Sequence, residues 1–470
     1  MKRFLLLLFV ISGLHSVAQH VPRLIEDLGK HDFAKEPVHS LNGSWEIYYQ
    51  RLLFPEDFKT PDPKREAILT KPSSWGDIRV NGKALENKGY ATYRITLVHL
   101  PAEELVLDAY SMQTSYRIFI NGKLSAEVGR PGKDLLSTVP MNRDVQVSLP
   151  LTDTVEIIVQ AANFHHRKGG FVHPFEIGTR KAITKQRMTY YLLDVTETSA
   201  LAIIGLFLLA LFIFRRKDLS ILYFALFCIT LSFRPVIAVN YLLSTLVEQI
   251  NWSLMLKTEY LAMLFPCLFM LLFIRKLFTA QFPKLLFTIF RNVLLTMIII
   301  VAAFPPSVFS WLVLPILIII PAGVTLFAIT IIRAIVAQVE GARYAGFGLA
   351  TLLLSLILKV TVYAGLIEQV QVLITLLDVG FIFMMSLILG SRFSLQFSKV
   401  ERLQIKTELQ HLEIQNQKIE VEKQKEKLEE KNKSIIDSIN YAKRIQNSLL
   451  TSEKYIERKL KELRKNRKGS

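Results

Sequence analysis

The chain has 470 residues, of which 51% are hydrophobic and 21% are charged, and its formal net charge is +17. This composition is typical of a membrane protein that also carries soluble parts. The only two cysteines, Cys228 and Cys267, lie in apolar stretches, which argues against a disulfide-stapled secreted module and suits a protein of a bacterial envelope.

Residues 1–18 have the pattern of a secretory signal peptide. Lys2 and Arg3 precede an apolar stretch at 4–14, and the small residues Ser16 and Ala18 precede a cleavage position before Gln19. The apolar stretch is too short for a stable membrane span. We therefore expect the region that follows to be exported. An uncleaved anchor is the alternative, and it would add one membrane crossing.

Residues 19–181 are predicted to form an antiparallel β-sandwich. The dipeptide Asn121-Gly122 joins two alternating runs and favours a two-residue hairpin, because both residues tolerate positive φ. Trp45 and Trp75 are expected to anchor the core. The runs that predict strands lie at 93–100, 105–112, 116–120, 123–128, 145–149 and 155–161.

Residues 190–392 are predicted to cross a membrane seven times, since a span needs about 20 apolar residues. The loops between the apolar runs alternate between loops that carry Lys or Arg and loops that carry none. By the positive-inside rule, the region before the first span lies outside and the region after the last span lies in the cytoplasm. A soluble protein with a buried helical core is the alternative. The runs lie at 192–214, 219–240, 254–276, 285–304, 309–332, 345–366 and 372–391.

Four charged residues within these runs are predicted to form an intramembrane charge layer: Arg234, Glu259, Lys359 and Asp378. All four lie at a similar depth below the outer ends of their spans. Because a charge in hydrocarbon is costly, we expect Arg234 to pair with Glu259 and Lys359 to pair with Asp378. Such pairs could couple ligand binding to helix movement. Static stabilisation of the bundle, or side chains that reach the interface, is the alternative.

Residues 393–450 are predicted to form a cytoplasmic coiled coil. Asn416 occupies a core position, and a buried Asn favours a fixed register in a parallel homodimer. A second, offset seam starts at Leu428. A solvated single helix is the alternative. The first seam runs through Ile405, Leu409, Leu412 and Ile419.

Residues 451–470 are predicted to be a basic tail. Its Lys and Arg residues suit an acidic partner or the anionic headgroups of membrane lipid. Nucleic acid is not expected as a partner, because no stacking aromatics accompany the charge. A solvated, frayed helix end is the alternative.

Several motifs occur in order along the chain: LNGSWEIY at 41–48, PSSW at 72–75, GYATYR at 89–94, SYRIFING at 115–122, NFHHRKGG at 163–170, and DVGF at 378–381 followed by GSRF at 390–393. The set resembles bacterial seven-transmembrane receptors with diverse intracellular signalling modules. This resemblance implies that residues 19–181 form a galactose-binding-like jelly roll that binds a carbohydrate or another small ligand. It also implies a location in the bacterial cytoplasmic (inner) membrane.

Seven residues are candidates for ligand binding in the predicted sandwich. Aromatic side chains can stack on a sugar face, and Arg and Asn side chains can hydrogen-bond its hydroxyls. For the tryptophans, a role in the core is the alternative. No metal site is predicted. The candidates are Trp75, Tyr90, Arg94, Tyr116, Arg117, Asn163 and Arg167.

Residues 431–446 resemble the linker that leads into a SpoIIE-like serine/threonine phosphatase in related receptors. The 24 residues that follow Gln446 are too few for such a domain. We therefore expect no enzyme activity and no cofactor, and we expect a separate cytoplasmic signalling protein as the partner. A truncated receptor phosphatase that acts as a decoy or dominant-negative subunit is one alternative, and a transporter is another.

Overall fold

The computed structural model describes residues 25–43, 45–59, 63–214, 216, 218–239, 241–247, 250–363, 367, 370–449 and 452–467. The predicted signal peptide at 1–18 lies outside these residues. The chain divides into two units, one that ends at Leu389 and one that begins at Gly390.

The first unit starts with a β-sandwich, as predicted. The larger sheet has the strand order β10 (Lys123–Val128), β9 (Ser115–Ile120), β12 (Val155–Asn163), β7 (Gly89–Val98), β3 (Trp45–Tyr49) and β4 (Ala67–Leu69), and β1 (Ile25–Asp27) pairs with β7 in parallel. The smaller sheet has the order β11 (Val145–Ser148), β8 (Leu105–Ala109), β13 (Glu176–Thr179) and β2 (Val38–Ser40). A short hairpin joins β5 (Arg79–Val80) and β6 (Lys83–Ala84).

The sandwich core is strongly aromatic. The Phe171 ring lies 5.2 Å from Trp45, 4.8 Å from Tyr93 and 5.0 Å from Phe175, measured between centroids. Such tilted and edge-to-face contacts add to the hydrophobic stabilisation of buried rings. The hairpin predicted at Asn121-Gly122 joins β9 and β10, and both residues have positive φ.

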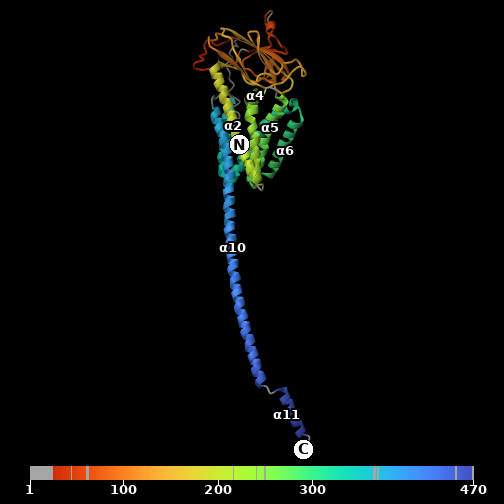
Figure 1. Cartoon of the computed structure of the whole chain (residues 1–470). Helices are drawn as coiled ribbons and strands as arrows, with labels where there is room; N and C mark the ends of the chain where they lie inside the picture. Colours follow the sequence, from red (N-terminus) through yellow and green to blue (C-terminus); the bar gives the residue numbers. More distant parts are fainter. Residues whose placement is uncertain are drawn as a thin grey trace. The chain divides into compact units, whose positions relative to one another are not determined.

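Seven helices of the described chain are long and apolar enough to cross a membrane. The first, α2 (Arg180–Phe214), begins at the end of β13, so its polar first turns extend the predicted apolar run towards the sandwich (Figure 1). The others follow as α3 (Leu219–Arg234) with the π-helical segment η3 (Pro235–Val239), α5 (Trp252–Leu277), α6 (Lys284–Ala303), α8 (Val313–Val336), α9 (Ala342–Tyr363) and the start of α10 (Gln371–Leu449).

Short elements lie between the long helices. They are α4 (Leu242–Leu246), α7 (Pro306–Phe309) and η4 (Ser310–Leu312), and the sandwich adds the 3-10 turns η1 (Pro55–Phe58) and η2 (Trp75–Asp77).

The second unit holds the rest of α10 and the helix α11 (Glu453–Asn466). Every side chain that the structure describes from Phe397 to Arg467 is exposed. The sequence has no Gly or Pro from 393 to 468, which is consistent with the course of α10 through this stretch to Leu449.

Candidate functional site

Three of the predicted ligand-binding residues lie in the sandwich core. Trp75, Tyr116 and Asn163 are fully buried. The Trp75 indole N–H donates to the Tyr93 hydroxyl, and the Tyr116 hydroxyl donates to the Arg143 carbonyl at 2.8 Å. A ligand cannot reach these side chains, so they stabilise the core instead. For Trp75 this is the core role that the sequence left open as the alternative for the tryptophans.

Asn163 organises the loop that follows β12. Its Nδ2 donates to the carbonyls of Asn87 at 2.8 Å, His166 at 2.8 Å and Lys168 at 2.9 Å. Its Oδ1 accepts from the His166 N–H at 2.9 Å. Because both ends of the amide are occupied, none of its polar atoms is left for a sugar hydroxyl.

Three other candidates share the outer face of the larger sheet. Arg94 donates to Glu156 Oε1 at 2.8 Å, and Arg117 contacts Glu127 Oε1 at 2.6 Å. Tyr90 lies on the same face, four residues before Arg94 on β7, and is partly exposed. These three side chains are therefore the partly accessible members of the predicted ligand-binding set, since Arg94 and Arg117 are only 21% and 18% exposed and the Phe58 ring lies 4.8 Å from Arg94.

A buried ion pair joins the sandwich to the first long helix. Arg187 of α2 donates to both carboxylate oxygens of Asp108 on β8, one of them at 3.0 Å from Nε, and it lies 3.7 Å from Asp144. The side chains of Arg187, Asp108 and Asp144 are only 11%, 1% and 6% exposed. We call these three residues the Arg187 latch. The Tyr191 hydroxyl accepts from Arg187 Nη1 at 3.3 Å and completes the contact.

The acids of the latch are electrostatically perturbed. Burial raises the pKa of Asp108, and the Arg187 guanidinium opposes that shift. Burial also raises the pKa of Asp144, to about 6, against Arg187 and a hydrogen bond from the Ser111 N–H at 2.7 Å. Arg187 therefore favours the charged form of both carboxylates, against the effect of burial.

A second set of contacts joins sandwich loops to the helical bundle. Trp252, the first residue of α5, donates from Nε1 to Asn142 Oδ1 at 3.2 Å. The Arg167 N–H donates to Ser310 Oγ at 3.1 Å, and the carbonyl of the same serine accepts from the Tyr260 hydroxyl at 3.1 Å. Arg167, a predicted ligand-binding residue, thus lies at the junction of sandwich and bundle.

The predicted charge layer is only partly paired. Lys359 Nζ lies 2.7 Å from Asp378 Oδ2, and Ser355 Oγ donates to Asp378 Oδ1 at 2.6 Å, so the structure brings this pair together between α9 and α10. Arg234 and Glu259 form no ion pair or hydrogen bond with each other in the described part of the chain. Arg234 is exposed on the last turn of α3, whereas Glu259 Oε2 is buried without a hydrogen-bond partner, so the expectation of a direct pair is wrong.

Helix α2 also contributes to this layer, which was not predicted. The charges of Asp378, Lys359 and Arg234 all act on Glu197. Asp194, one turn earlier on α2, is buried. The signal was present in the sequence, since two acids three residues apart are unusual in an apolar span.

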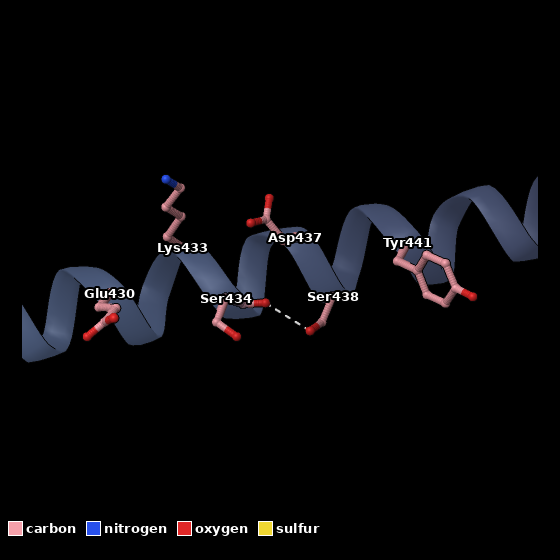
Figure 2. Close-up of a pocket in the computed structure, with 6 residues that line it drawn as sticks. All are labelled: Glu430, Lys433, Ser434, Asp437, Ser438 and Tyr441. Carbon is pink, nitrogen blue, oxygen red and sulfur yellow. Dashed lines mark hydrogen bonds between the residues drawn. The ribbon is translucent and has the colours of Figure 1, made fainter.

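The tail carries the remaining predicted site residue. Asn416 is exposed on α10 in the single chain. A shallow hollow lies further along α10, and Figure 2 shows the six residues that line it: Glu430, Lys433, Ser434, Asp437, Ser438 and Tyr441. All six side chains belong to one helix, so the hollow is a polar helix face rather than an enclosed site.

Comparison with known protein families gives a match for the helical part. Residues 191–392 match the family model described as 7TM diverse intracellular signalling. No curated protein matches the chain.

Solved structures match a stretch that covers 30% of the chain, and they include three enzymes. Bacteroides uniformis beta-glucuronidase 2 is 18% identical with a TM-score of 0.23 and 17% of its chain covered. A glycosyl hydrolase family 2 member from Bacteroides cellulosilyticus is 11% identical with a TM-score of 0.24 and 20% covered. Faecalibacterium prausnitzii beta-glucuronidase is 16% identical with a TM-score of 0.24 and 31% covered. The chain thus spans less than a third of each of these proteins.

Proposed function

We propose, from the premise that residues 191–392 are a domain of the 7TM diverse intracellular signalling family, that this membrane signalling receptor senses a small ligand through its β-sandwich. The sandwich lies outside a bacterial cytoplasmic membrane and the tail lies in the cytoplasm. The tail passes the signal to a separate signalling protein as a parallel dimer.

The observation that carries this proposal is the Arg187 latch. A ligand changes a conformational equilibrium only if it binds one state more tightly than the other. A ligand that moves the smaller sheet would move Asp108, and Arg187 would pass that movement to α2. The contacts of Trp252 and Ser310 offer a parallel route to α5 and to the segment before α8.

A carbohydrate is the ligand class that we propose. The accessible set of Tyr90, Arg94 and Arg117 combines an aromatic ring with two guanidinium groups, which can stack on a sugar ring and donate to its hydroxyls. Both arginines are already paired with carboxylates. Their orientation is therefore fixed before the ligand arrives, which lowers the entropy cost of binding.

The charge layer is the proposed switch within the membrane. The buried, unpartnered oxygen of Glu259 can gain a partner if α3 or α5 shifts, whereas Lys359 and Asp378 are already joined. Two discrete arrangements of such charges would give the bundle two states.

The test uses full-length protein in lipid nanodiscs, with a fluorophore on a single cysteine introduced at Ser448 in a background that lacks Cys228 and Cys267. Hexoses, hexuronic acids, their oligosaccharides and amino acids are added in turn. We expect a carbohydrate to stabilise the protein against heat and to change the tail fluorescence.

Two variants separate binding from relay. Arg117→Ala should abolish both responses. Arg187→Met combined with Asp108→Asn, which removes the latch without leaving a buried charge, should keep the thermal stabilisation and lose the fluorescence change. Stabilisation by amino acids alone would contradict the ligand class, and a full fluorescence response in this double variant would contradict the relay through the latch.

A further inference from the structure

The tail carries an apolar stripe of strict seven-residue spacing that crosses from α10 into α11. Of the 64 residues from 400 to 463, only 18 are Val, Ile or Leu, yet eight of the ten stripe positions are. Chance would place about three there. The seven-residue stripe consists of Val400, Thr407, Ile414, Val421, Leu428, Ile435, Ala442, Leu449, Ile456 and Leu463.

The stripe is uncovered in the single chain. Its Val, Ile and Leu side chains are each between 44% and 78% exposed. Each of these side chains would contribute about 1.5 to 3 kcal/mol of hydrophobic stabilisation if it were fully buried. Burying the row against a partner would therefore stabilise the tail.

The seven-residue spacing indicates what kind of partner can bury the row. On a straight helix of 3.6 residues per turn, a seven-residue repeat drifts by about 20° per heptad. Nine heptads separate Val400 from Leu463, so the row would wind roughly halfway round an isolated helix. Only a partner helix that supercoils around the first can contact the whole row as one continuous seam.

The opposite face supports this assignment. Glu430 and Asp437 each follow a stripe residue by two positions, and Lys433 precedes one by two, which places them about 200° round the helix from the seam. They line the polar face in Figure 2. In α11, Arg458 and Lys465 likewise follow stripe residues by two positions. From Leu428 to Lys465 the helix is thus apolar on one side and charged on the other across both segments. Before Leu428 the opposite face carries the first predicted seam, since Ile405, Leu412 and Ile419 each precede a stripe position by two residues, so the continuous seam that leads into α11 is the one that starts at Leu428.

We propose that α11 is the last segment of the dimer seam, paired in parallel and in register with α11 of a second copy of this chain. The inference rests on the proposed dimer of the tail and goes beyond it, because residues 451–470 were predicted to be a separate basic tail. A second copy is the occupant that fits, since two copies that leave the same membrane in the same direction present identical stripes at identical heights.

The interruption between α10 and α11 does not oppose this pairing. α10 ends at Leu449, and Ser452 caps α11 by accepting from the Tyr455 N–H at 3.3 Å. Leu449 and Ile456 are nevertheless seven residues apart. Because both copies are interrupted at the same residue, Ile456 can meet Ile456 of the other copy whether or not the helix is continuous there.

The test is disulfide crosslinking of full-length protein in native membranes, in a background without Cys228 and Cys267. Matched single cysteines are introduced on the stripe and two residues after it: Ile435→Cys with Asp437→Cys in α10, and Ile456→Cys with Arg458→Cys in α11. All four sites are exposed, so none of the substitutions disturbs a core. A disulfide requires Cα atoms within about 7 Å, which a seam position meets and an outer position does not.

We expect several-fold more crosslinked dimer from Ile435→Cys and Ile456→Cys than from their partners two residues later. If Ile435→Cys crosslinks strongly and Ile456→Cys no better than Arg458→Cys, the seam ends within α10 and this inference is wrong, while the proposed dimer stands. If neither stripe cysteine exceeds its control, the dimer itself fails and the inference fails with it.

Discussion

Replacing Arg187 by Met removes the cation of the latch and should destabilise the sandwich by an amount that depends on pH. Asp108 is 1% exposed, so its carboxylate cannot be rescued by water. Breaking a buried ion pair from one side costs about 3 to 5 kcal/mol. The Asp108 carboxyl can instead take up a proton, so the loss of stability cannot exceed the free energy of protonating it.

This upper limit on the loss of stability follows from the ordinary pKa of an aspartate, near 3.9. Protonating the carboxyl at pH 7 costs about 4 kcal/mol, and at pH 5 about 1.5 kcal/mol. In the variant the folded-state pKa of Asp108 lies above its unfolded value. The folded state then binds the extra proton, and stability falls as the pH rises, by about 1.4 kcal/mol per pH unit. Asp144, 3.7 Å from Arg187, changes the slope in the same direction.

Hydrogen exchange of the full-length protein, followed by mass spectrometry of peptides from β8 and β13, measures this cost. At pH 7 we expect exchange up to about a thousandfold faster than in the wild type after correction for intrinsic rates. Arg180→Met is the matched control. Arg180 lies on the same helix as Arg187 and pairs with Glu104 at 2.6 Å, but this pair lies in solvent, with side chains 50% and 58% exposed. It should change exchange little.

A second variant tests the assigned cause. Adding Asp108→Asn to Arg187→Met removes the stranded charge and should recover most of the protection, because replacing both partners of a buried pair costs less than removing one. The assigned role of Arg187 is contradicted if Arg187→Met costs no more stability than Arg180→Met, or if its cost is the same at pH 5 and pH 7.

Three further predictions concern other parts of the first unit. Lys359→Asp and Asp378→Lys should each lower the yield of folded receptor in membranes, and the double swap should restore it; a double variant no better than either single would exclude the pair. The wild type should lose stability as the pH rises from about 4 to about 6, because burial raises the folded-state pKa of Asp144 to about 6. Asp144→Asn should remove this loss, and thermal unfolding across that pH range measures it. Gly169→Ala should destabilise the sandwich by about 1 to 3 kcal/mol, because the added Cβ would overlap the Trp75 ring; a thermal midpoint equal to the wild type would show that the loop relaxes freely.

The helical bundle was largely predictable because its main signal is local. A membrane span is defined by a run of apolar residues, and each of the seven predicted runs overlaps one of the long apolar helices, although the runs at 219–240, 285–304 and 345–366 extend past the helix ends. Six strands were likewise predicted from alternation, and β10 was placed at its observed bounds. The short strands β1 to β6 include only one of five residues, so their periodicity is too brief to detect.

The latch was not predictable because its partners are remote in sequence. Asp108 and Arg187 are 79 residues apart, and no spacing rule links a strand to a helix at that separation. The intramembrane pairs show the same limit. Lys359 and Asp378 lie on consecutive helices at matched depth and meet. Arg234 lies where α3 gives way to η3, so its direction could not be inferred from an ideal helix.

The unbroken helix α2 constrains how this sandwich could be exchanged for another. It begins at the last strand and continues for 35 residues into the bundle without a hinge. Each residue added or removed at such a join turns the grafted domain by about 100° and moves it by about 1.5 Å. A chimeric receptor should therefore respond at one junction, fail when the junction is one residue longer, and recover about seven residues later, when the azimuth returns to within about 20°.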